Sequence, residues 1–255
     1  MGTKMKSLIS IISVVTAFIL WQIAPGRFVD AFFLPTPLQV LAGLWEIVLD
    51  GSLPGSVVAS LYRIFAGWLL GSAVAIPIGL MVGTFDGLKR AFDPFIHFFR
   101  FVPAIALVTL FIVWFGIGEM SKIMLIAYAT GFIVLVNTAS GVGSISAGKT
   151  DAARCLGASP WQVFQHVILP ASLPNIYIGM RLALASSFLV IVAAEMMAAN
   201  SGLGYLIWTS RLYFRIDIMF GAIFVLGLLG FVTDRLMRVF GRLVMQRYLR
   251  DALKY

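Results

Sequence analysis

The sequence predicts an all-α, polytopic membrane protein that forms a single domain, residues 1–255, with about six transmembrane helices. Hydrophobic residues make up 60% of the chain, charged residues only 12%, and the mean hydropathy is +0.98. A soluble domain carries about twice that share of charge. The apolar runs are unbroken instead of alternating, and lipid admits only helices or closed barrels. Helices are therefore favoured.

Each apolar run is long enough to cross a hydrocarbon core about 30 Å thick, the last with help from its flanks. The first run follows Lys4 and Lys6, as in a signal peptide, but residues 21–25 offer no small-residue cleavage site, which favours an uncleaved span. The predicted spans are residues 8–24, 57–82, 95–115, 123–142, 177–199 and 218–233.

Basic residues predict the orientation, because loops on the cytoplasmic side carry an excess of Lys and Arg. If both termini are cytoplasmic, only Arg27, Lys122, Arg211 and Arg215 fall outside. The inner set is about three times larger: Lys4, Lys6, Lys89, Arg90, Lys149, Arg154, Arg235, Arg238, Arg242, Arg247, Arg250 and Lys254. We therefore expect both termini in the cytoplasm.

The segment between the first two spans predicts a short helix on the outer side. Thr36 can cap a helix that starts with Pro37 and has Gln39 as its capping-box partner. Its apolar residues then share one face: Leu38, Leu41, Trp45 and Leu49. A helix lying in the membrane interface and a helix packed on the bundle fit this pattern equally well.

Small residues recur every fourth position in the second span. The positions are Gly67, Gly71, Gly79 and Gly83, with Ala75 between them. Such a ladder lets another helix backbone approach closely. It predicts helix packing, either within the chain, which is the simpler interpretation, or in a moving seam or dimer contact.

The segment GSISAGKT, Gly143 to Thr150, fits the phosphate-loop pattern of nucleotide-binding proteins. That motif requires a preceding strand and a following helix in a parallel α/β domain, whereas here a predicted membrane span precedes it. We therefore interpret the match as accidental and predict that the chain is not itself an ATPase.

The connection from about residue 149 to 175 predicts two short helices. Thr150 can cap a helix that begins at Asp151, and Gly157 permits the turn that ends it. Ser159 can cap a second helix, with Pro160 at its first position and Gln162 as capping-box partner. Its end is expected at the prolines that follow, Pro170 and Pro174.

This connection resembles the hallmark loop of permease subunits of ATP-binding-cassette (ABC) importers, which reads E-A-A, three residues, G, nine residues, I-x-L-P. Two positions differ conservatively, with Asp for Glu and Val167 for Ile. The positions that match, or that carry the conservative Asp, are Asp151, Ala152, Ala153, Gly157, Leu169 and Pro170.

Three further segments resemble the nitrate, sulfonate and taurine branch of these permeases. They are FLPTPLQVL in the first outer segment, Arg100 to Ile123, and Val192 to Ile207. With the connection they cover most of the chain. Phe101 departs from the branch, where proline usually follows the arginine, although Pro103 can still disturb the third span.

The resemblance implies the fold of a type I importer permease in a bacterial inner membrane. The connection would act as the coupling helix that docks in a cytoplasmic ATPase. Expected partners are a second permease copy in a homodimer, two ABC ATPase subunits, a periplasmic or lipid-anchored solute-binding protein, and lipid. No cofactor is expected on this chain, because ATP and Mg would bind to the ATPase.

The implied function is a translocation path for a small anionic solute of the sulfonate/taurine, nitrate or bicarbonate class. Arg100 and Glu195 are the deeper ionisable residues and the candidates for this path, although they could instead pair with each other. Arg63, Arg181 and Asp234 lie near span ends, where snorkelling would explain them. A heterocyclic vitamin precursor is the alternative solute.

Other classes have weaker support. An ion-coupled secondary transporter would need midplane acids, and only Glu195 offers one. A membrane-embedded enzyme would need clustered polar residues, but His97 and His166 are far apart. Cys155, the single cysteine, excludes an intramolecular disulfide, and no spacing predicts a metal site. Basic residues gather at span ends, which argues against nucleic-acid binding.

Overall fold

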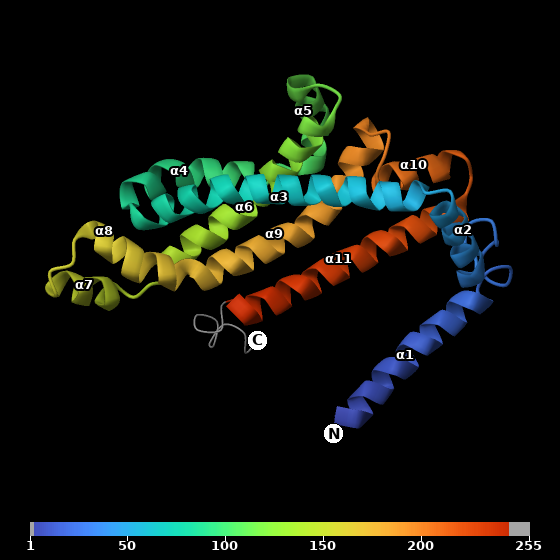
Figure 1. The fold of residues 1–255 in the computed structure, drawn as a ribbon, viewed down its shortest axis with the longest axis horizontal. Helices are drawn as coiled ribbons and strands as arrows, with labels where there is room; N and C mark the ends of the chain where they lie inside the picture. The colour runs from blue at the N-terminus through green and yellow to red at the C-terminus, as the bar shows by residue number, and fades with distance from the viewer. Residues whose placement is uncertain (1–2, 245–255) are drawn as a thin grey trace.

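The computed structural model describes the backbone of residues 3–244 and the side chains of residues 12–243. Figure 1 shows a long bundle built on α3 (Ser52–Thr84), α6 (Glu119–Gly143), α9 (Leu169–Ala198) and α11 (Ile216–Val244). The other elements are α1 (Thr3–Ile23), α2 (Pro37–Leu49), α4 (Asp86–Phe99), η1 (Ala104–Leu107), α5 (Val108–Phe115), α7 (Ala147–Cys155), α8 (Pro160–Val163), η2 (Phe164–Ile168) and α10 (Leu203–Leu212).

The core of the bundle lies where α6 packs against both α3 and α9. Ile64 of α3, Ile126 and Val134 of α6, and Ile191 of α9 are completely buried in it. Lipid is as apolar as these side chains, so the hydrophobic effect does not hold membrane helices together. Close backbone packing must therefore supply much of the attraction.

The glycine ladder provides this close approach between α3 and α6. A Cβ atom added at Gly67 would lie 2.6 Å from Ile126 Cβ, and one added at Gly83 would lie 2.6 Å from Val142 Cβ. Gly71 and Gly79 meet the α6 backbone in the same way. The predicted helix packing is present, and the facing helix belongs to the same chain.

The third predicted span, residues 95–115, is wrong as a single helix. The chain instead forms α4 and then the η1–α5 segment, and the two are bent by 83° relative to each other. The helix α4 already starts at Asp86 and ends at Phe99. Pro103 lacks an N–H group and disfavours a helical conformation for Val102, so the helix cannot continue through this point.

By length and composition, four helical segments of the described part can each cross a membrane: Ser52–Thr84, Glu119–Gly143, Pro160–Ala198 and Ile216–Leu243. The bent pair of α4 with η1–α5 makes a possible fifth. The part of α1 with described side chains, Ile12–Ile23, is by itself too short to span. The first predicted span therefore stays a prediction.

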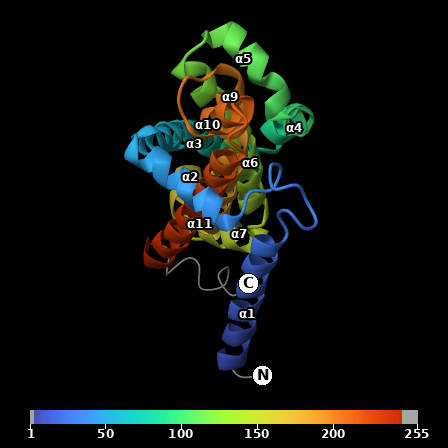
Figure 2. The ribbon, with the colours of Figure 1, turned by 90° about the vertical axis from the view of Figure 1, so that its right-hand side faces the viewer.

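The helix predicted between the first two apolar runs is present as α2, which lies across the end of the bundle where α3 and α11 begin (Figures 1 and 2). The capping box is present: the Gln39 N–H donates to Thr36 Oγ1 at 3.3 Å, and the Thr36 N–H donates to Gln39 Oε1 at 2.8 Å. Val40 and Ile47 are buried, while its other apolar face is exposed: Leu38, Leu41, Trp45 and Leu49.

An ion pair ties α2 to the start of α11. Arg215 donates to both carboxylate oxygens of Glu46, at 3.0 and 2.6 Å, and also to Asp217. The hydrogen bonds from Arg215 lower the pKa of Glu46. This arrangement holds α2 across the bundle end.

Candidate functional site

The predicted coupling segment folds as a two-helix projection, here called the knob, which consists of α7 and α8. Figure 1 shows the knob at the end of the bundle opposite α2 and α10. Gly157, in the turn between the two helices, has φ +82°, a left-handed conformation that favours glycine. Its N–H donates to Arg154 O at 2.9 Å. The Ala158 N–H donates to Ala153 O at 3.1 Å, which completes a Schellman motif.

The first knob helix starts earlier than its sequence predicts. Its N-cap is Ser146, so Thr150 lies inside the helix, where its hydroxyl donates to Ala147 O at 2.8 Å. The prediction of a Thr150 cap is therefore wrong. Asp151 and Ala152 are exposed on this helix, and the Asp151 carboxylate lies 3.7 Å from Arg154.

The second knob helix begins as predicted, with the Ser159–Gln162 capping box present. Its predicted end at Pro170 and Pro174 is wrong, because α8, η2 and α9 form one continuous helix over Pro160–Ala198, with Pro174 inside α9. The element η2 is a wide π turn, in which the Leu169 N–H donates to Phe164 O. It shifts the hydrogen-bond register just before Pro170, which then occupies the first turn of α9, where a missing N–H costs little. The second helix of the knob is therefore continuous with a membrane-crossing helix.

The surface of the knob carries large apolar side chains. Leu156 is 89% exposed, and Trp161 is 63% exposed and stacked on the Phe164 ring at 5.3 Å between centroids. Ala153 and Leu169 are half-buried instead, against a cluster around Val163. Exposed apolar groups on a projecting segment are typical of a surface that meets another protein.

The phosphate-loop-like segment joins two helices. Gly143 is the last residue of α6, and Lys149 and Thr150 lie in the first turn of α7.

A buried polar cluster, here called the arginine cluster, lies at the end of the bundle opposite the knob. Arg63 of α3 is only 3% exposed and makes five hydrogen bonds. Two reach the Glu119 carboxylate at 2.6 and 2.8 Å, and one reaches Glu195 Oε1 at 2.6 Å. Two more go to the carbonyl and hydroxyl of Ser201. All five guanidinium donors are therefore used.

Glu195 is completely enclosed in this cluster. Besides Arg63, its carboxylate accepts from the Ser60 hydroxyl at 2.9 Å and from the Gly204 N–H at 2.8 Å. Gly202 has φ +115°, and any Cβ there would collide with the Glu195 carboxylate. The loop before α10 can therefore close over the acid only because it carries glycine. A role for Glu195 on the path would require this cluster to open.

The structure changes the interpretation of the other ionisable residues. Snorkelling is wrong for Arg63, because its guanidinium is buried among acids. Snorkelling does not explain the position of Arg181 either, because its Nε lies 2.6 Å from the Asp234 carboxylate. Glu195 pairs with Arg63 and not with Arg100, so the two path candidates occupy separate places. Sequence spacing could not have revealed these pairs, whose members lie 53 to 132 residues apart.

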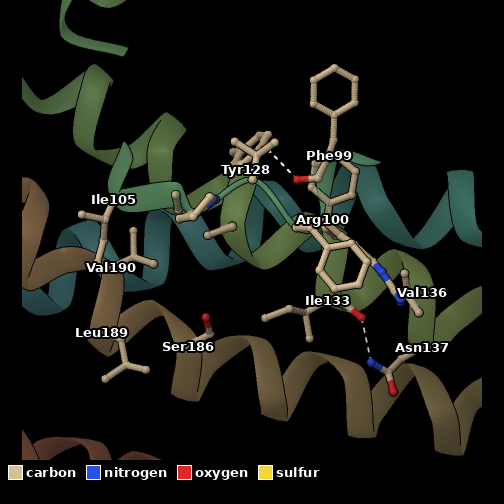
Figure 3. Close-up of a pocket in the computed structure, with 16 residues that line it drawn as sticks. Phe99, Arg100, Ile105, Tyr128, Ile133, Val136, Asn137, Ser186, Leu189 and Val190 are labelled. Carbon is tan, nitrogen blue, oxygen red and sulfur yellow. Dashed lines mark hydrogen bonds between the residues drawn. The ribbon is translucent and has the colours of Figure 1, made fainter. Parts of the chain in front are cut away.

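Arg100 lines an open cavity of about 510 Å³ at the bend between α4 and η1. Figure 3 shows its guanidinium beside Val136 of α6, with the Ser186 hydroxyl of α9 also facing the cavity. The Tyr128 hydroxyl donates to Phe99 O at 2.8 Å, which fixes the bend against α6. Much of the remaining wall is apolar: Phe101, Ile105, Phe132, Ile133, Leu189 and Val190.

A second cavity, of about 600 Å³, shares Val136 with the first and is lined by α6 residues as far as Gly143, close to the start of α7. Three polar side chains of α4 line it, namely Lys89, Asp93 and His97. With Arg100 these residues recur at helical spacing on one face of α4. The charged side chains that line the two cavities are therefore two basic residues, Lys89 and Arg100, and one acid, Asp93.

The bundle, the bent span and the knob together define a polytopic membrane subunit that carries a projection for another protein. The chain belongs to the family described as binding-protein-dependent transport system inner membrane component, whose model matches residues 75–246. The resemblance drawn from the coupling segment is thereby confirmed.

Curated relatives fall in the same class. A protein of Brucella melitensis named as a probable ABC transporter permease is 39% identical over 85% of this chain and 88% of the relative. The taurine transport system permease TauC of Escherichia coli is 35% identical over 87% of this chain and 82% of the relative. The nitrate import permease NrtB of Leptolyngbya laminosa is 30% identical over 78% and 75%.

Solved structures of ABC importers share the fold. An inward-facing structure of the MetNI methionine transporter matches with a TM-score of 0.63 at 20% identity, over 80% of this chain and 97% of the other. A bacterial importer of the polysaccharide alginate matches with a TM-score of 0.67 at 15% identity, over 94% and 95%. The predicted all-α fold of a type I importer permease is therefore confirmed.

Proposed function

We propose that this chain forms the translocation path of an ABC importer for a small oxyanion of the sulfonate/taurine or nitrate class. The observation that carries the proposal is the capped knob on a helix continuous from Pro160 to Ala198, in a member of the binding-protein-dependent family. The names of TauC and NrtB support the class of solute. The positive charges of Lys89 and Arg100 in the two cavities, against the single acid Asp93, suit an anion.

The proposed assembly contains a second copy of the chain, two ATPase subunits and a solute-binding protein. The knob would face the cytoplasm and dock in the ATPase through Leu156 and Trp161, which are exposed apolar groups. The arginine cluster would then lie near the outer face. Both termini would be cytoplasmic; residues 245–255, with Arg247, Arg250 and Lys254, lie outside the described part.

The proposed mechanism depends on a rigid connection. ATP and Mg bind to the ATPase subunits, and their closure moves the knobs. Because α8, η2 and α9 are one helix, movement of the knob tilts α9, which lines the Arg100 cavity through Ser186 and Val190. The coupling residues are those predicted from sequence: Asp151, Ala152, Ala153, Gly157, Leu169 and Pro170.

We expect Gly157→Val to abolish transport-linked ATP hydrolysis in the assembled importer while the chain still inserts in membranes. The φ of +82° is strained for a β-branched residue, so the Schellman turn must rearrange and α8 loses its direction. The measurement is solute-stimulated ATPase activity in proteoliposomes.

The control for this variant is Gly148→Val in the neighbouring helix. A Cβ atom meets nothing within 4 Å at either glycine, but Gly148 lies inside α7 and does not have a positive φ. Its variant should retain stimulation. If Gly157→Val retains it as well, the knob does not transmit the movement.

We also expect the purified chain alone to show no saturable ATP binding. The segment before Lys149 connects helix α6 to helix α7 and does not follow a strand. The backbone N–H groups are therefore not arranged around this lysine as they are in a phosphate-binding loop. Equilibrium dialysis with labelled ATP, compared between the parent and Lys149→Ala, is the measurement. A binding signal that depends on Lys149 would contradict the accidental interpretation of the motif.

A further inference from the structure

Arg100 has no acidic partner among the described residues, in contrast to three other arginines of the bundle helices. Within the described residues Arg63, Arg181 and Arg238 each form an ion pair with a carboxylate of the chain. The only interaction found for the Arg100 guanidinium is with the Phe101 ring, whose centroid is 4.7 Å away. Its charge is therefore available to a ligand.

The surroundings of Arg100 provide a second unused donor. The Ser186 side chain makes no hydrogen bond within the described residues, although the neighbouring Ser187 hydroxyl donates to Leu184 O at 2.6 Å. Figure 3 shows the Ser186 oxygen facing the same cavity as Arg100. A cation and a hydroxyl in one cavity match an oxyanion, which accepts hydrogen bonds through several oxygens.

The position of the cavity also favours a ligand-binding role for Arg100 over a purely structural one. It lies against residues inside two membrane-crossing helices, Ile133 of α6 and Val190 of α9. An arginine at such depth faces the bundle interior or a water-filled space and not lipid, because burying its charge in hydrocarbon is costly. The bond from Tyr128 to Phe99 O holds the bend, and so Arg100, in place.

We propose that the cavity around Arg100 is a binding site for a small oxyanion, in which the guanidinium and the Ser186 hydroxyl hold the oxygens while the wall at Phe132 and Leu189 contacts the apolar part. This inference rests on the proposed function in taking the oxyanion to be the transported solute. The second cavity, with Lys89 and His97, would receive the anion next on the way to the knob end, and its Asp93 carboxylate would limit how tightly it is held.

The test measures the charge preference of the cavity directly. The full-length chain carries Cys155→Ser, so that the thiol introduced by Ser186→Cys is its only one, and is placed in lipid nanodiscs. Rates of thiol modification are compared for a sulfonatoethyl and a trimethylammonioethyl methanethiosulfonate, each divided by its rate on free cysteine. The ratio should favour the sulfonate reagent and fall about tenfold in Arg100→Gln, the scale expected for removing one unit charge from a partly desolvated site.

A competition arm distinguishes binding from a general positive potential. Methanesulfonate should slow modification by uncharged methyl methanethiosulfonate, and a higher concentration should be needed in Arg100→Gln, while choline chloride at equal ionic strength has no effect. Arg211→Gln is the matched control, because Arg211 also packs on an aromatic ring, that of Trp208, but does not line the cavity. It should change neither result.

Three outcomes would overturn the proposal: a thiol that no reagent reaches, a charge ratio unaffected by Arg100→Gln, or protection by chloride equal to that by methanesulfonate. None of these readouts involves the ATPase. Failure of the anion site can therefore be distinguished from failure of the coupling that Gly157→Val tests.

Discussion

Arg63→Met is expected to destabilise the chain by about 3–5 kcal/mol, because it leaves a buried carboxylate without its cation. Glu195 is completely buried, and Arg63 is the only described basic side chain within ion-pair distance of it. Methionine replaces the apolar stem of arginine but supplies none of its five donors. The measurement is the free energy of unfolding in one detergent, followed by intrinsic tryptophan fluorescence.

The arginine cluster offers its own graded controls. Glu119→Gln should lower the free energy of unfolding much less, because the Glu119 side chain is 49% exposed and Arg63 still forms its ion pair with Glu195. Adding Glu195→Gln to Arg63→Met should recover part of the loss, because the buried charge is then removed. Equal stability of Arg63→Met and the parent chain would show that the cluster does not hold the bundle end together.

Gly71→Ala is expected to lower the free energy of unfolding by about 3 kcal/mol, which is at the upper end of the losses typical of overpacked cores. The added Cβ would lie 2.5 Å from Ala127 O, a backbone atom of α6, so no side chain can turn aside to make room. The whole α3–α6 seam must widen, which also loosens the neighbouring contacts at Gly67 and Gly79. We would measure this as a lower midpoint of thermal unfolding in the same detergent.

The control for this substitution lies on the facing helix at the same seam. A Cβ added at Gly131 of α6 would lie 3.7 Å from Gly71 O, an ordinary van der Waals distance. Gly131→Ala should therefore be tolerated or slightly stabilising, since alanine has the higher helix propensity. A similar loss in both variants would mean that the ladder is not what sets the spacing of the two helices.

Features that depend on neighbours in sequence were predicted well. The capping boxes at Thr36 and Ser159, the left-handed turn at Gly157 and the small-residue face of the second span all follow from residues within a few positions of one another. The unbroken apolar runs likewise predicted membrane-crossing helices, because their length depends only on the thickness of the hydrocarbon core.

Helix ends were predicted wrongly where two local sequence signals favoured different structures. Pro170 reads as a helix terminator, yet a π turn before it lets the helix continue into the membrane. Thr150 reads as a helix cap, yet the residues before it are also compatible with a helix, and α7 starts at Ala147. The sequence indicated that Pro103 would disturb the third span. The angle of 83° between α4 and the η1–α5 segment, however, depends on how η1 and α5 pack.

The sequence by itself determined the class of protein, the four long crossing helices, the knob with its glycine turn and the family, because these depend on local hydropathy, capping and the spacing of a short motif. Only the tertiary structure decided which charges meet. It paired Glu195 with Arg63 and left Arg100 free in a cavity, and it showed that the glycine ladder faces α6. The physical reason is that the packing of the helices decides which charged residues form an ion pair in a membrane protein. Arg63 and Glu195 are 132 positions apart, and the residues next to each of them in sequence do not indicate how their helices pack.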